Sequence, residues 1–247
     1  MAGARPSTLS APLLLELWER GAAWHPLDQA LLVVQTADTD GPAEDPSEWT
    51  IGRRDRRLLE IRRDTFGDRI DGCAECPACR SSLEFELSCA GLMALQGSAR
   101  SVEQTIEHEG VPWVMRAPNS RDLAVAALGP DLDSARTALL ARCAQPLHRD
   151  GPDATEWTES RRAALGEALA VLDPLAEILI DLTCQVCGHA WQCLFDIATF
   201  LWSEIRARCR RLLQDIDVLA RTYGWTETEI LRLSDQRRGL YVQMALS

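Results

Sequence analysis

The sequence predicts an α+β protein that is mainly helical, and three observations predict it. Apolar residues recur at helical spacing through most of residues 1–66 and 196–247. Two C-x-x-C pairs, at 76–79 and 184–187, are separated by 104 residues. The segment 83–87 after the first pair alternates apolar and polar residues, as a strand with one buried face does, and a mostly apolar segment at 178–182 leads into the second pair. We therefore expect paired strands at the centre, helices at both ends, and a large mixed insertion between the cysteine pairs.

Residues 1–66 form a predicted N-terminal helical region. Ser10 is placed to cap a first helix that Gly21 ends, and a second helix follows Pro26. The third helix, at 52–65, carries six arginines with three acidic residues between them. An exposed, salt-bridged face is the preferred interpretation of this helix, and a site for an acidic partner or a phosphate is the alternative.

The two cysteine pairs predict a split four-cysteine zinc ribbon, with its first half at 67–89 and its second half at 176–195. Each C-x-x-C turn presents two thiolates, and two such turns supply the tetrahedral set that Zn²⁺ accepts in structural sites. The ligands that we assign to one structural Zn²⁺ are Cys76, Cys79, Cys184 and Cys187. Gly188 suits the left-handed residue that such a turn often needs, and Arg80 stands at the matching place in the first turn.

The same cysteines have alternative interpretations, namely free buried thiols and an iron–sulfur or redox pair. A disulfide framework is not expected, because the nine cysteines are an odd number and the early apolar run at 11–15 lacks a cleavage-site pattern. Cys73 extends the first pair to C-x-x-C-x-x-C and is an additional candidate ligand. We expect His189, which follows the second pair, at the surface beside the metal rather than bound to it.

Residues 90–175 form the predicted mixed α/β insertion. The elements expected in it are a hairpin over 101–108 and 111–116, a helix capped by Asn119 or Ser120, and helices over 134–144 and 158–171. Pro, Gly and acidic residues are frequent at 37–48 and 146–156, so we expect solvated connections there.

Residues 196–247 form the predicted C-terminal helical arm. Its longest helix covers about 196–222, where apolar residues form a stripe near the 3.6-residue period, and Gly224 ends it. A short helix with an acidic first turn follows Thr226, and the last helix covers 235–245.

Composition narrows the classes of function. The formal net charge is −11, and all 26 basic residues are arginines. An acidic chain is a poor general binder of nucleic acid, because phosphate neutralisation needs a basic surface. The absence of lysine removes Schiff-base and P-loop chemistry. No apolar stretch approaches the roughly 20 residues of a membrane span, so we expect no membrane association and a cytoplasmic protein whose thiols stay reduced.

The sequence predicts a protein that is not an enzyme. None of the four histidines belongs to an H-E-x-x-H motif or to a recognised pair of base and nucleophile. No glycine-rich loop for phosphate is present. Four thiolates would close the coordination shell of zinc, whereas a catalytic zinc keeps one position open.

Several motifs resemble those of a known family. They are CQVCGH at 184–189, FDIATFLWSEI at 195–205, YGWTETEIL at 223–231 and RRGLY at 237–241, with WERG at 18–21 and PNSRDL at 118–123. These segments resemble the phage baseplate protein family, also called baseplate hub assembly chaperones, of contractile-tail phages and contractile injection systems. The resemblance implies a non-enzymatic assembly factor or a structural component of a phage-tail-like baseplate. Its partners would be hub, spike or wedge proteins, and it would act in the cytoplasm or stay in the assembled particle.

An assembly factor needs surfaces that bind a partner. Trp202 and Trp225 belong to amphipathic elements, and burial in the protein's own core is the alternative for both. The terminal helix is short and amphipathic, and it suits docking on another subunit. The candidate partner-binding residues are therefore Trp202, Trp225, Arg237, Arg238 and Tyr241.

Two other functions are carried forward as competing hypotheses. A zinc-ribbon protein that binds nucleic acid, such as a transcription accessory protein, would use the arginines of 53–63, but the net charge of −11 argues against it. A redox or metal-dependent enzyme would use the cysteines, and their reactivity before and after chelation of the metal separates this hypothesis from a structural site.

Overall fold

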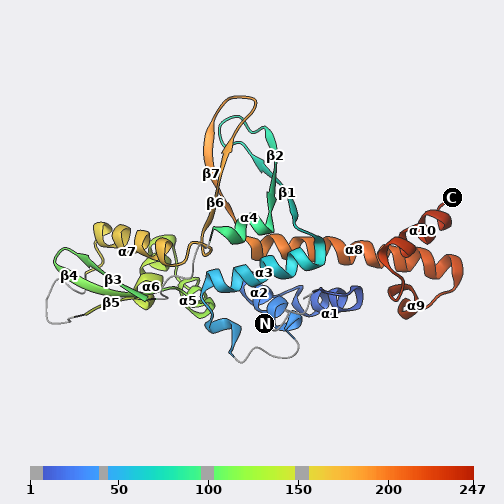
Figure 1. Ribbon diagram of the computed structural model, residues 1–247, viewed down its shortest axis with the longest axis horizontal. Coiled ribbons are helices and arrows are strands. Elements are labelled where there is room, and N and C mark those ends of the chain that lie inside the picture. Colours follow the sequence, from blue (N-terminus) through green and yellow to red (C-terminus); the bar gives the residue numbers. More distant parts are fainter. Residues whose placement is uncertain (1–7, 39–43, 96–102, 148–155) are drawn as a thin grey trace.

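The computed structural model describes residues 8–38, 44–95, 103–147 and 156–247. It confirms a mixed, mainly helical protein with small sheets. Figure 1 shows an elongated molecule: a central group of helices carries two β-hairpins on one side, the insertion lies at one end, and the C-terminal helices lie at the other. The predicted connections at 37–48 and 146–156 fall partly on 39–43 and 148–155, which lie outside the described residues.

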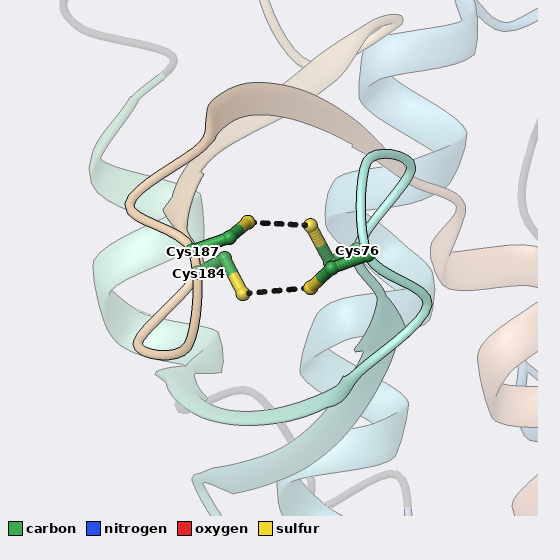
Figure 2. Close-up of side chains that lie close together, drawn as sticks. Cys76, Cys184 and Cys187 are labelled. Carbon is green, nitrogen blue, oxygen red and sulfur yellow. Dashed lines mark hydrogen bonds between the residues drawn. The ribbon is translucent and has the colours of Figure 1, made fainter.

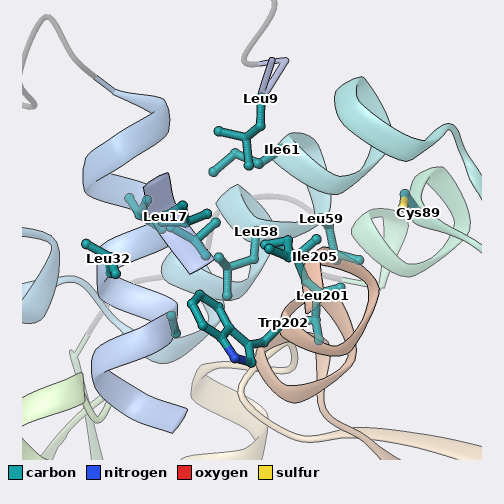
Figure 3. Close-up of a cluster of buried hydrophobic side chains, with 14 of the residues drawn as sticks. Leu9, Leu17, Leu32, Leu58, Leu59, Ile61, Cys89, Leu201, Trp202 and Ile205 are labelled. Carbon is teal, nitrogen blue, oxygen red and sulfur yellow. The ribbon is translucent and has the colours of Figure 1, made fainter. Parts of the chain in front are cut away.

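Four helices build the central body. They are α1 (Ala11–Gly21), α2 (Pro26–Ala37), α3 (Ile51–Phe66) and the first half of α8 (Ile197–Tyr223). Their apolar faces meet in one core, which includes Leu17, Leu58, Leu59, Leu201 and Ile205, and each of these side chains is at most 1% exposed (Figure 3). Burial of a leucine or isoleucine side chain contributes about 1.5–3 kcal/mol, so this core dominates the stability of the body.

The arginine-rich helix α3 is ion-paired, as the preferred interpretation expected, but part of its charge is buried. Arg53 pairs with Glu44 and Arg57 with Asp38 near the surface. Arg54 and Arg62, in contrast, are each only 3% exposed, so an exposed face is the wrong description for these two residues. Each of them has a carboxylate partner, because an unpaired buried charge is costly.

Two antiparallel hairpins rise from the body side by side (Figure 1). The first consists of β1 (Arg69–Glu75) and β2 (Ser82–Ser88), and the second of β6 (Ile178–Thr183) and β7 (Ala190–Phe195). A short helix, α4 (Cys89–Ala94), follows β2 and was not predicted from the sequence. It begins at Cys89, directly after the last residue of β2.

The insertion has a hydrophobic core of its own. Its sheet has the order β3 (Glu103–His108), β4 (Val111–Arg116) and β5 (Ala144–Pro146). Its helices are α5 (Ser120–Ala126), α6 (Leu132–Cys143) and α7 (Glu159–Leu172). The side chains of Trp113, Met115, Leu140 and Leu165 pack between the sheet and the helices. The three-residue strand β5 is too short to show a period of two, which is why the sequence did not predict it.

The C-terminal arm extends α8 beyond the body (Figure 1). Gly224 ends α8 in the left-handed conformation, with φ of 69°. The chain then forms α9 (Glu227–Leu231) and α10 (Asp235–Ala245), and the N-caps Thr226 and Ser234 accept hydrogen bonds from the first turns of these helices. In the described part of the chain, no helix is both long and apolar enough to cross a membrane.

Candidate metal centre

The tips of the two hairpins bring the distant cysteine pairs together. Cys76 and Cys79 lie in the turn between β1 and β2, and Cys184 and Cys187 lie in the turn between β6 and β7. Figure 2 shows the two turns facing each other with their side chains pointing into the space between them. The four sulfur atoms all lie within 4.8 Å of one another.

The two turns have the same backbone geometry. The amide of Cys76 donates to the carbonyl of Ser81 at 2.9 Å, and the amide of Cys184 donates to the carbonyl of His189 at 2.8 Å. In each turn the fourth residue after the first cysteine donates back to that cysteine's carbonyl, at 2.9 Å from both Arg80 and Gly188. Both of these residues are left-handed, with φ of 65° and 73° respectively. The predicted equivalence of Arg80 and Gly188 is therefore correct.

The sulfur separations match a tetrahedral thiolate site. Cys76 Sγ lies 3.7 Å from Cys187 Sγ, and Cys79 Sγ lies 3.6 Å from Cys184 Sγ (Figure 2). Sulfurs about 2.3 Å from a central zinc ion would lie about 3.8 Å apart at the edges of a tetrahedron. A disulfide would instead need a separation of about 2.05 Å. The arrangement is therefore compatible with a metal ion bound between the hairpins.

Local hydrogen bonds favour the thiolate form of two of these cysteines. The Ser81 hydroxyl, 2.9 Å from Cys79 Sγ, lowers the pKa of this thiol to about 6. Backbone amides of Cys187 and Val186 lower the pKa of Cys184, and the Val186 amide lies 3.4 Å from its sulfur. Because the thiolate is the form that binds metal, these contacts favour metal binding by Cys79 and Cys184. At Cys187 the backbone amide of His189 lowers the pKa, but the neighbouring thiols of the cluster raise it to about 12.

Arg62 contacts the base of the first hairpin and the helix that follows the second hairpin. The sequence did not predict this role for Arg62. Its guanidinium donates to the carbonyls of Gly67 and Arg69, where the first hairpin begins, at 2.7 and 2.5 Å. It also donates to Glu204 of α8 at 2.8 and 3.0 Å. Because α8 directly follows β7, one buried arginine fixes the start of one hairpin relative to the end of the other. Its place among the other arginines of α3 gave no signal of this role.

Three further residues near the site do not join the cluster. Cys73 is exposed on β1, opposite Glu84, and the group of four sulfurs in the described residues excludes it. His189 is exposed, as expected, and stacks on Trp191 with ring centroids 6.1 Å apart. Cys193 lies on β7, paired with Ile180 of β6. Cys73 does not join the cluster because it still lies in β1, before the turn that contains Cys76 and Cys79.

The candidate partner-binding residues do not form one surface. Trp202 is 8% exposed and belongs to the body core. Arg238 is 1% exposed and pairs with Asp215 and Asp235. Neither side chain is available to a partner, because packing and ion pairing within the chain occupy both. Trp225 and Tyr241 are half-buried and contact each other at 4.9 Å between ring centroids.

Among those five positions, Arg237 is the one whose side chain is exposed.

No family model, no curated protein sequence and no solved structure matches this chain. The four-cysteine cluster is thus the feature on which a functional proposal must rest.

Proposed function

We propose that the four cysteines bind one structural Zn²⁺ and that the protein is a non-enzymatic, protein-binding assembly factor built around this split zinc ribbon. The observation that carries the metal proposal is the approach of four sulfurs within 4.8 Å from turns 104 residues apart. Four soft thiolates in a closed tetrahedral set suit zinc. The ion would cross-link the two hairpins and so fix both ends of the insertion to the body.

The small size of the two hairpins and their limited packing support a structural role for the metal. Each is a two-stranded sheet, and an isolated two-stranded hairpin is marginally stable in water. The outer residues of β6 and β7 include Leu179 and Leu194, which are 46% and 60% exposed, so the hairpins bury little at their outer faces. A metal at the tips would supply the stability that packing does not.

The partner proposal rests on the resemblance of the motifs at 184–205 and 223–241 to baseplate hub assembly chaperones. In this role the protein would bind a hub, spike or wedge protein while a contractile baseplate is built. Co-expression of the tagged protein with the hub, spike and wedge proteins of its own gene cluster tests the role. A stoichiometric complex with one of them is expected, and recovery of the protein alone would overturn this part of the proposal.

Metal analysis tests the zinc site separately. Elemental analysis of the reduced, purified protein should give about one zinc per chain. Cys76→Ser and Cys184→Ser, one in each turn, should both lose the metal and lower the melting temperature. Cys73→Ser and Cys193→Ser are matched controls near the hairpins that should keep it. Wild-type protein without zinc, or bound iron with a visible absorption spectrum, would overturn the assignment.

A further inference from the structure

Ion pairing divides the arginines of this protein into two groups. Of the 23 arginines in the described part of the chain, 18 form an ion pair with an aspartate or a glutamate. The five that form none with any described residue are Arg206, Arg210, Arg211, Arg232 and Arg237. All five are exposed, and all five lie in the C-terminal arm.

The net charge shows the same division. The arm, residues 196–247, contains eight arginines and seven acidic residues, a net charge of +1, and its part from residue 206 onward carries eight arginines and five acidic residues, a net charge of +3. Residues 1–205 contain 18 arginines and 32 acidic residues, a net charge of −14. A basic segment in an otherwise acidic chain indicates a local interaction surface rather than a general property of the protein.

Four acidic residues of the arm make contacts within it. Asp215 and Asp235 bind the buried Arg238, and Asp217 pairs with Arg221 one turn along α8. Glu229 closes a capping box with Thr226 at the start of α9, and the charge of Arg232 helps to lower its pKa. None of these contacts involves Arg206, Arg210 or Arg211.

Three of these arginines lie close together on the solvent side of α8. Arg206 and Arg210 are four residues apart and therefore neighbours on one face of the helix, and Arg211 is adjacent in sequence. Like charges at this spacing destabilise a helix. Leu213, which is 40% exposed, follows Arg210 by three residues on the same face.

The end of the arm also exposes apolar side chains. Leu240 and Met244, four residues apart on α10, are 55% and 66% exposed, and Leu246 is 71% exposed. The residues of α10 that face α8 include Arg238, which is buried against it. Leu240 and Met244 lie on the side of α10 away from Arg238. Arg206 and Arg210 lie on the side of α8 away from Arg208 and Asp215, the residues that contact α10. The apolar side chains of α10 and the arginines of α8 are therefore separate surfaces.

We infer that the C-terminal arm is the surface that captures the protein's partner, and that the partner presents an acidic segment with apolar residues. Arginine forms charge-assisted, two-point hydrogen bonds with carboxylates, so acidic side chains would satisfy Arg206, Arg210 and Arg211. A leucine-type residue of the same segment would cover Leu213, which lies on the face of Arg206 and Arg210. This inference rests on the proposed role as a protein-binding assembly factor and adds the site and the chemistry of the partner.

Charge and surface composition favour an acidic protein over a nucleic acid. The charge of −14 on residues 1–205 would repel a phosphate backbone that ran past the arm. The exposed Leu213 side chain among these arginines matches an apolar protein side chain and has no counterpart on phosphates. A short acidic segment of a partner can reach the arm without crossing the acidic body.

Binding of labelled probes to the full-length, metal-loaded protein tests the inference. The probes are a short acidic peptide with leucines at helical spacing, the same peptide with serines in place of leucines, and a single-stranded oligonucleotide of equal charge. Fluorescence anisotropy at low ionic strength should show the leucine peptide binding most tightly. The variant R206Q/R210Q/R211Q should weaken this binding by about ten-fold or more, and L213S should reduce the preference for leucine.

The matched control is R20Q/R63Q/R121Q, which removes three exposed but ion-paired arginines outside the arm and changes the net charge equally. It should weaken binding by less than about two-fold, because exposed, paired charges contribute little. Equal loss in both triple variants, or tighter binding of the oligonucleotide than of either peptide, would overturn the inference.

The co-expression experiment with baseplate proteins separates this inference from the proposed function. If a baseplate protein co-purifies equally well with wild type and with R206Q/R210Q/R211Q, the proposed function stands and the arm is not the capture surface. If no baseplate protein is recovered while the peptide binds in an arm-dependent manner, the arm surface stands and the baseplate role fails.

Discussion

The carboxylate of Asp173 accepts a hydrogen bond of 2.7 Å from the backbone amide of Gly52, 121 residues earlier in the chain. Gly52 lies in the first turn of α3, where amides have no partner within the helix. Asp173 follows α7, at the point where the insertion returns to the second hairpin. The contact therefore ties the exit of the insertion to the body.

Replacement of Gly52 by alanine should destabilise the protein. A Cβ atom there would lie 1.8 Å from Asp173 Oδ1, so the carboxylate must move and the amide loses its acceptor. We expect a loss of about 2–3 kcal/mol in the free energy of unfolding, measured by urea denaturation. Gly166→Ala in α7 is the control, because its nearest neighbour would be 3.6 Å away. It should gain up to about 1 kcal/mol from helix propensity, and a similar gain in Gly52→Ala would contradict the contact.

The two metal-binding turns should respond in opposite directions to changes at their left-handed residues. Gly188→Ala puts a side chain at φ of 73° and should cost about 1–2 kcal/mol. Arg80→Gly relieves the same constraint at φ of 65° and should stabilise its turn by up to about 1 kcal/mol. The rate of zinc transfer to a chromogenic chelator measures both effects: faster for Gly188→Ala, and unchanged or slower for Arg80→Gly. Equal rates in the two variants would contradict the equivalence of the turns.

Asp122 is the centre of a polar cluster in the insertion. Its fully buried carboxylate accepts hydrogen bonds from Arg116 at 2.6 and 3.0 Å and from Arg142 at 2.7 Å, and it also accepts the amide of Asn119 at 3.1 Å. Burial raises the pKa of this carboxyl, but the hydrogen bonds outweigh burial and lower the pKa from 3.8 to about 2. The lowered pKa means that folding favours the ionised form.

The stability that Asp122 supplies should therefore disappear in acid. It is present above the ordinary carboxyl pKa of 3.8 and is lost as the pH falls from about 4 to about 2, by roughly 2–3 kcal/mol. Asp122→Asn should be less stable than wild type at neutral pH, and the difference should shrink over this pH range. Chemical denaturation at a series of pH values measures it, with Asp133→Asn on the surface of α6 as the control. A difference that is independent of pH would contradict the assignment.

The two tryptophans proposed for partner binding should differ in their effect on stability. Trp202 lies against Gly21 in the body core, where a Cβ on Gly21 would come within 2.5 Å of the indole. Trp202→Ala should cost about 3–5 kcal/mol. Trp225 stacks on Tyr223 at 4.8 Å but is half-buried, so Trp225→Ala should cost about 1–2 kcal/mol. Thermal unfolding compares them, and an unchanged melting temperature for Trp202→Ala would show that this side chain is not a core residue.

Local patterns in the sequence predicted much of this structure. The helices α9 and α10 begin after Thr226 and Ser234, whose side chains cap them, and Gly224 ends α8 as expected. Helix α1 begins directly after Ser10, but the Ser10 side chain makes no capping hydrogen bond, so that part of the prediction is wrong. The spacing within each cysteine pair predicted two equivalent turns, because a C-x-x-C turn is set by a few consecutive residues. Each of these features depends on neighbours in sequence, which is why the sequence alone determined them.

Only the tertiary structure decided which charges are buried, paired or free. Arg62 and Arg237 both stand in arginine-rich segments, yet Arg62 is buried on Glu204, 142 residues away, and Arg237 is exposed without an acidic partner among the described residues. Arg238, adjacent to Arg237, is buried by the packing of α10 on α8. Ion pairing and burial of these arginines depend on elements that are distant in the chain, so the local pattern of apolar and polar residues does not predict them. The sequence therefore predicted the two cysteine turns, and the fold revealed the exposed arginines of the arm.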